Sequence, residues 1–206
     1  RKETLLDLCR FSSNENDEIM SLSSYLDKMP ENQKEIYYIS AETRSQALAS
    51  PHLEGFKSKN IPVLIMTDAI DQFWLPMIGS FKDKKFTSIT QGQINLDDLD
   101  EKNKDKKSEN KDQKEKQDKE FVDLIAQMKV VLGEQVKDIR LSSKLTDSPV
   151  CLVADDGDMD IAMEQLMAQR DTNYKGAPRI LEINGDHSLI KNMKSLLSKK
   201  ENNDLV

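Results

Sequence analysis

Residues 36–66 read IYYISAETRSQALASPHLEGFKSKNIPVLIM, and this stretch decides the fold of the first half of the chain. The runs at its two ends, 36–39 and 62–66, are short, apolar and rich in β-branched or aromatic residues, which is typical of buried strands. Between them, 41–49 favours a helix, and the Ser-Pro pair at 50–51 is typical of the cap and first turn of another short helix. A strand, a helical crossover and a second strand predict a parallel pair with a right-handed connection.

The alternation of helix and strand continues outward from this stretch in both directions. Helices are expected at 4–11, 21–29, 52–59, 68–81, 121–132, 158–170 and 187–197. Further strands are expected at 136–141, 149–154 and 180–183, and 86–89 is expected to add an edge strand. The order predicts an α/β fold class with two small α/β domains.

A purely polar segment separates the two predicted domains. Residues 101–120 read EKNKDKKSENKDQKEKQDKE, with eight Lys, seven acidic residues and no apolar side chain. Such a segment cannot offset the entropy of ordering by burial, which favours a solvated linker. Lys, Glu and Gln also favour helix, so a polar extension of the following helix is the second interpretation.

The composition argues against several classes of function. The 206 residues carry a formal net charge of -7, whereas binding a nucleic-acid backbone requires a basic face. No apolar run approaches the roughly 20 residues of a membrane-spanning helix, so we expect a soluble chain with no membrane partner. The chain opens with Arg1 and shows no signal segment, and we expect an internal piece of a longer cytoplasmic protein.

No catalytic or metal-binding signature emerges from the sequence. It contains no Gly-rich phosphate loop, GxSxG elbow, HExxH motif or Walker lysine. His52 and His187 are too few for a histidine-based zinc site. Cys9 and Cys151 lie far apart within apolar stretches, and we expect both to be free, buried thiols.

Three aspartates at alternate positions, Asp156, Asp158 and Asp160, invite comparison with a calcium-binding loop. That loop requires Gly at its sixth position and Glu at its twelfth, where this chain has Ile161 and Met167. The cluster is better explained as negative charge at the N-terminus of the following helix.

A methionine-rich stripe follows the acidic cluster. Met159, Met163, Leu166 and Met167 recur at helical spacing. One interpretation is a stripe that faces the core. The other is an exposed adhesive face for non-native polypeptide, since Met side chains adapt to irregular apolar partners.

Adjacent aromatic residues lie in the helix expected after the second strand. Phe73 and Trp74 cannot both point inward, because neighbours on a helix are about 100° apart. One of them is therefore expected to be partly exposed, either as an ordinary half-buried side chain or as an anchor for a partner. Pro76 is expected to kink the helix or to begin it.

Several stretches together resemble one protein family, the ninety-kilodalton heat-shock chaperones, and most closely its bacterial HtpG branch. They are YLDKMPENQKEIYYIS at 25–40, SPHLE at 50–54, VLIMTD at 63–68, LGEQVKDIRLSSKLTDSPVCLV at 132–153 and INGDH at 183–187. The resemblance covers nearly the whole chain except the polar segment, and the 132–153 string is long and specific.

The resemblance implies a fragment of a larger protein that has an N-terminal ATPase domain, a middle domain and a C-terminal dimerisation domain. It divides this chain into the end of a middle-domain coil region at 1–20, a small three-layer α/β/α subdomain at 21–95, a polar linker or helix extension at 96–120, and a mixed α/β C-terminal domain at 121–206. By the same resemblance, we expect the chain to end before the family's final dimerisation helices. The resemblance thus implies a homodimer for the intact protein and leaves the pairing of this segment alone open.

The resemblance also implies a function for both apolar surfaces. In the family, the helix that matches 158–170 and the region that contains Phe73 contact client proteins. The implied client-binding residues are Phe73, Trp74, Met159, Met163, Leu166 and Met167. The nucleotide site, with its ATP and Mg²⁺, would lie outside this segment, which is expected to hold no cofactor and to catalyse no reaction.

Two other functions remain open at this point. One is a small α/β enzyme that uses His52 or His187 with nearby carboxylates, in a pocket at the carboxyl ends of the parallel strands. The other is a structural module that transmits motion and binds no client.

Overall fold

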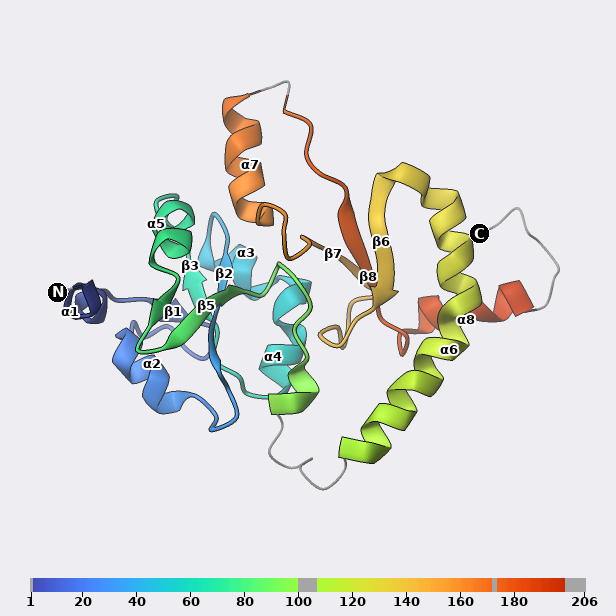
Figure 1. The fold of residues 1–206 in the computed structure, drawn as a ribbon, viewed down its shortest axis with the longest axis horizontal. Coiled ribbons are helices and arrows are strands. Elements are labelled where there is room, and N and C mark those ends of the chain that lie inside the picture. Colours follow the sequence, from blue (N-terminus) through green and yellow to red (C-terminus); the bar gives the residue numbers. More distant parts are fainter. Residues whose placement is uncertain (1, 100–106, 172–173, 199–206) are drawn as a thin grey trace.

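The structure is a computed structural model that describes residues 2–99, 107–171 and 174–198. It contains two sheets, one in each half of the chain, with strand orders β1-β3-β2-β5-β4 and β6-β8-β7 (Figure 1). Helices pack on both sheets, so the predicted fold class of two α/β domains is confirmed.

The first sheet is built around the pair of strands that the sequence predicts. β2 (Glu35–Ser40) runs parallel to β3 (Leu64–Met66), with Tyr38 opposite Leu64. On its other side β2 is parallel to β5 (Lys84–Ser88). The short strands β1 (Ser12–Ser13) and β4 (Ser80–Phe81) add antiparallel edges.

The expectation of an edge strand at 86–89 is wrong in its position. β5 lies between β2 and β4, because the chain turns back at Lys82 and Asp83. Both of these residues have positive φ, 45° and 62°, as tight hairpin turns require.

Alternate strand residues divide the core of this domain into two apolar clusters, one on each face of the sheet. One face packs against α3 (Arg44–Leu48) and α4 (Glu54–Ser58), through side chains that include Tyr37, Ile39, Ala47, Leu53, Phe56, Val63 and Ile65. The other packs against α1 (Lys2–Leu8), α2 (Leu22–Lys28) and α5 (Asp71–Ile78), through side chains that include Leu6, Leu22, Tyr25, Ile36, Leu64, Leu75 and Phe86. The result is the three-layer arrangement implied by the resemblance.

Local chemistry explains where several helices begin and end. α3 starts at Arg44, later than expected, because the Thr43 side chain accepts the N–H of Gln46. The cap at Ser50 is confirmed, and a single 3-10 turn, η1 (Pro51–Leu53), precedes α4. α5 ends at Ile78, and its C-cap is Gly79, whose φ of 72° suits glycine.

From their spacing, Leu5, Leu8 and Cys9 are expected to form the apolar side of the first helix, but the structure shows a different buried face. Leu5 and Leu8 are exposed and Leu6 is buried instead. Cys9 is exposed as well, so the expectation of a buried thiol is wrong there and right for Cys151.

The second sheet has β8 (Arg179–Ile183) at its centre, parallel to β6 (Val136–Leu141) and antiparallel to β7 (Val150–Val153). α6 (Lys107–Leu132) and α8 (Ser188–Ser198) cover one face of it. Their shared core includes Phe121, Leu124, Met128, Ile139, Ile183 and Ile190. α7 (Ile161–Arg170) stands apart from this core, beside α5 and the first sheet (Figure 1).

The polar segment is at least partly helical. α6 begins at Lys107, so the charged residues from there onward extend the helix expected at 121–132. This agrees with the interpretation of the segment as a polar helix extension. Residues 100–106 lie outside the described part of the chain. The division into domains stays a prediction.

Candidate functional site

The N-terminal end of α7 is fixed by Asp160. Its carboxylate caps the helix by accepting the N–H of Ala162 at 2.9 Å. It also accepts the hydroxyls of Ser88 and Thr90 at 2.5 and 2.8 Å, which ties α7 to the end of β5. The assignment of the acidic cluster to a helix N-terminus therefore holds for Asp160.

The neighbouring aspartates form ion pairs rather than a cation site. Lys137 Nζ lies 2.8 Å from Asp155 and 3.0 Å from Asp158. Among the described residues, no cluster of His, Cys, Asp and Glu is arranged to hold a metal ion.

The apolar residues of α7 remain accessible. None of the ten residues of the helix is buried, which contradicts the core-facing interpretation. Met159 and Met167 are 39% and 37% exposed, and Met163 and Leu166 are half-buried. Met159 lies just before the helix, because the cap at Asp160 starts α7 later than the periodicity indicated.

The adjacent aromatics on α5 differ in exposure, as the helical geometry requires. Phe73 is 39% exposed, whereas Trp74 packs between Phe11 and Phe86 with ring centroids 6.1 and 5.9 Å away. The Trp74 indole N–H donates to Asp71 at 2.7 Å, which satisfies its polar edge. Trp74 is thus largely a core residue, and Phe73 is the exposed one.

The last turn of α5 adds one more exposed apolar side chain. Met77 is 85% exposed, and the sequence reasoning did not identify it. Pro76 lies inside α5 and neither begins nor ends it. Phe73 and Met77 are four residues apart and therefore share one side of the helix.

A cleft separates α7 from the carboxyl ends of β2 and β3. It has two lobes, of about 280 and 610 Å³, that share lining residues on both walls. The α7 wall contributes Gln165 to both lobes and Leu166 to the smaller one, which Gln72 of α5 also lines. The helices that carry the expected client-binding residues thus border the same cleft.

The two histidines do not form a common site. His52 lines the larger lobe and is 8% exposed, and burial, together with the nearby Lys144 charge, lowers its pKa to about 4. His187 lies at the start of α8, where its Nδ1 accepts the N–H of Leu189. His52 Nδ1 has no hydrogen-bond partner among the described residues, so no carboxylate orients it as a general base would require.

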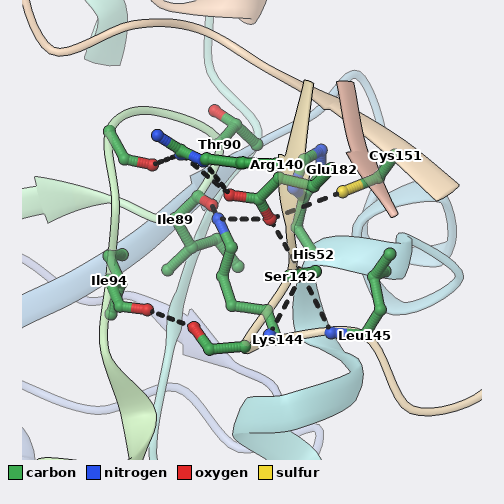
Figure 2. Close-up of polar contacts among 12 residues, drawn as sticks. His52, Ile89, Thr90, Ile94, Arg140, Ser142, Lys144, Leu145, Cys151 and Glu182 are labelled. Carbon is green, nitrogen blue, oxygen red and sulfur yellow. Dashed lines mark hydrogen bonds and ion pairs between the residues drawn. The ribbon is translucent and has the colours of Figure 1, made fainter. Parts of the chain in front are cut away.

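A buried polar network joins the two halves of the molecule (Figure 2). At its centre, Glu182 accepts Nε and Nη2 of Arg140 at 3.0 and 2.8 Å and the Ser142 hydroxyl at 2.8 Å. Lys144 is 1% exposed and donates to the Ile89 carbonyl at 3.1 Å, with its Nζ 3.7 Å from Glu182. Ile89 belongs to the first half of the chain and the charged residues to the second, so the network spans the interface.

The thiol of Cys151 lies at the edge of this network. Its Sγ is 3.9 Å from Glu182 Oε2. Burial, together with the Glu182 charge, raises the pKa of Cys151 to about 12. The group is therefore a poor nucleophile at neutral pH.

A second set of contacts holds the same interface from α4. The Glu54 carboxylate accepts the backbone N–H groups of Thr146, Asp147 and Ser148 at 2.8 to 3.1 Å, and the Ser148 hydroxyl. Burial raises the pKa of Glu54, but these hydrogen bonds outweigh it and lower the pKa below its ordinary value. The glycine that follows, Gly55, lets the backbone of Lys144 approach, since a Cβ there would lie 2.6 Å from its carbonyl oxygen.

Sequence reasoning did not identify these interface residues. Glu54 and 146–148 lie within SPHLE and LTDSP, two of the strings that carry the family resemblance. Without an alignment, nothing in either string indicates that the two segments contact each other.

Comparison with known proteins agrees with the resemblance. The family model described as Hsp90 protein matches residues 1–206. The chain is 41% identical over 189 residues to the chaperone protein HtpG of Roseobacter denitrificans, which covers 92% of this chain and 30% of the relative. It is 39% identical to the chaperone protein HtpG of Wolbachia pipientis wMel, over 98% of this chain and 31% of the relative. It is also 39% identical to the chaperone protein HtpG of Mycobacterium avium, over 94% of this chain and 29% of the relative. The chain thus spans about 30% of the length of the relatives it matches.

In the described part of the chain, no helix combines the length and apolar character needed to cross a bilayer.

Proposed function

The chain belongs to the Hsp90 family, and we propose that it is the middle and C-terminal segment of an ATP-dependent chaperone. In this role it binds non-native client polypeptides and couples their binding to an ATPase domain outside the segment. The relatives are chaperones by name, and their greater length leaves room for the further domains.

The exposed apolar side chains of α5 and α7 are the observation that carries the proposal. Phe73 and Met77 on one helix, and Met163 and Met167 on the other, leave apolar atoms accessible to solvent, and both helices border one cleft. A non-native client is distinguished by its own unburied apolar surface, and each contact contributes about 25 cal/mol per Å² removed from water. Several small contacts of this kind hold a client and still allow its release.

The polar interface supports the coupling part of the proposal. Glu54 and Glu182 each accept several hydrogen bonds, so the first domain and the second sheet resist relative movement. A movement imposed on the first domain is therefore transmitted to the second and to α7, whose cap is bonded to β5.

We assign no chemistry on a substrate and no cofactor to this segment. His52 lacks an orienting hydrogen-bonded carboxylate, and the buried Cys151 thiol is protonated at neutral pH. The expected partners are client polypeptides and, in the intact protein, a second copy of the chain. The expected location is the cytoplasm.

Suppression of aggregation tests the client-binding surface. With a chemically denatured, aggregation-prone enzyme as the client, Met163→Asp plus Met167→Asp should raise the chaperone concentration needed for half-maximal suppression by at least about three-fold, because charged side chains replace apolar contact area. Light scattering measures the aggregation, and circular dichroism checks that the fold is kept.

The matched control is Leu189→Asp plus Leu196→Asp on α8, where both residues are also exposed. This variant should suppress aggregation as the parent does. If the α7 variant protects the client equally well, α7 is not the contact surface.

A further inference from the structure

The charged side chains that line the cleft are all acidic. Glu42 and Asp68 line it, and among the described lining residues there is no Lys or Arg. The whole chain has 30 basic and 37 acidic residues, so this absence of cations is a property of the cleft. The nearby Arg44 is held elsewhere, since its guanidinium donates to the carbonyls of Ser13 and Asn16.

A third carboxylate, Asp160, lies next to the larger lobe, since it accepts the hydroxyl of the lining residue Thr90 at 2.8 Å. Asp160, at the start of α7, lies close enough to Tyr38 for its charge, after burial, to raise the pKa of that phenol. It also acts electrostatically on His52, which lines the larger lobe. Lys144, the cation near His52, does not line the cleft and donates to the Ile89 carbonyl (Figure 2).

The uncharged part of the lining suits a polypeptide backbone. It is rich in amide side chains, which both donate and accept hydrogen bonds, as an extended peptide requires: Gln46, Gln72, Gln165 and Gln169. Small and apolar side chains, Ala41, Ala162 and Leu166, line it as well.

Two enclosed polar atoms at the cleft have no partner. Ser40 Oγ and His52 Nδ1 are buried without a hydrogen bond to any described residue, and both side chains belong to residues that line the cleft. His52 is 8% exposed, so its unpaired nitrogen carries a free-energy cost that a small rearrangement around a bound ligand removes.

We infer that this cleft binds extended polypeptide segments that carry Lys or Arg beside small or apolar residues, and that it disfavours acidic segments. The inference rests on the proposed function, since it gives that function a sequence preference. The lobes, of about 280 and 610 Å³, have the size of sites that bind small ligands, about 300–1,000 Å³. Their carboxylates, Glu42 and Asp68, are exposed and able to pair with a basic side chain.

Fluorescence anisotropy with matched peptides tests this preference on the whole 206-residue chain. Three labelled peptides share one length and one apolar content, and their variable positions are all Lys, all Gln or all Glu. The Lys peptide should bind at least about five-fold more tightly than the Gln peptide, and the Glu peptide should bind more weakly than both. Added salt should reduce the difference.

Paired variants locate the effect. Glu42→Gln plus Asp68→Asn should abolish the preference for the Lys peptide, whereas Glu31→Gln plus Asp83→Asn, which removes two exposed carboxylates outside the cleft, should keep it. Gln165→Trp, which fills the cleft from α7, should weaken binding of the Lys peptide, and Asn192→Trp on the exposed side of α8 should not.

The possible failures separate the inference from the proposed function. Equal binding of all three peptides, or a preference that survives Glu42→Gln plus Asp68→Asn, overturns the inference and leaves client binding intact. Failure of all three peptides to bind at concentrations that suppress aggregation overturns the inference alone. Failure of both peptide binding and aggregation suppression overturns both.

Discussion

Gly55 lies where the backbone of the first half of the chain closely approaches that of the second. Its position lacks space for a side chain, because a Cβ would lie 2.6 Å from the carbonyl oxygen of Lys144 and 2.7 Å from Leu96 Cδ1. One of these neighbours is backbone and cannot turn away as a flexible side chain does. The close approach brings α4 near enough for Glu54 to bind the 146–148 turn.

Gly55→Ala should therefore lower the free energy of unfolding by about 1–3 kcal/mol, measured by urea denaturation. Gly157→Ala is the matched control, since a Cβ there meets nothing within 4 Å, and its effect should stay within about 0.5 kcal/mol. Equal effects of the two substitutions would show that the close contact is not maintained in solution.

His52 makes stability depend on pH. Burial, with the Lys144 charge, lowers its pKa from 6.5 to about 4 in the folded chain, so the unfolded chain takes up a proton first as the pH falls. Above pH 6.5 the protonation of His52 therefore does not change the free energy of unfolding. As the pH falls from about 6.5 to 4, it lowers that free energy by about 3 kcal/mol in total.

His52→Gln removes this titration, so its stability should fall less steeply over the same pH range than that of the parent. Urea denaturation at a series of pH values measures both curves. Curves that fall in parallel would contradict the assignment to His52.

At the level of elements, α7 differs from the other long helices because it has no buried residue. Its anchors are polar and lie at its N-terminal half, where Asp160 caps it and Glu164 pairs with Arg179. Helices that bury little apolar surface open locally at a low free-energy cost.

Amide hydrogen exchange should show this difference. Amides in the last turn of α7, near Met167, should exchange about 100-fold or more faster than those of β8, which is paired on both sides. Equal protection of α7 and β8 would mean that α7 is held by contacts the structure does not contain.

Helices and strands could be predicted from the sequence where they depend on adjacent residues alone. β2 and β3 could be predicted because each is a continuous apolar run, and the cap at Ser50 because it depends on adjacent residues. The buried face of α1 could not be predicted, because a helix of seven residues has too few apolar positions to define a face. The position of β5 within the sheet depends on the hairpin at Lys82 and Asp83, which carries no Gly or Asn to reveal it.

The candidate site could be predicted only in part. The exposed aromatic of α5 follows from helical geometry, and the exposure of the α7 methionines agrees with the interpretation taken from the family resemblance. The cleft and the interface could not be derived, because they join distant segments. Glu54 and Thr146, for example, are 92 positions apart.

At the scale of the whole molecule, hydrogen bonds link the first half of the chain to the second sheet, and the cap of α7 to β5. α5 and α7 border one cleft, which Gln72 lines from α5 and Gln165 and Leu166 line from α7. In the proposed function, a client that spans this cleft contacts both helices in a single binding event.

Methyl NMR of the methionines tests this account most directly, because the nine methionines of the chain lie both at the proposed surfaces and away from them. On titration with an unfolded client, the methyl signals of Met77, Met159, Met163 and Met167 should shift or broaden, and those of the buried Met20 and Met128 should stay unchanged. Saturation with client that leaves the first four signals unchanged would contradict the claim that these side chains bind it.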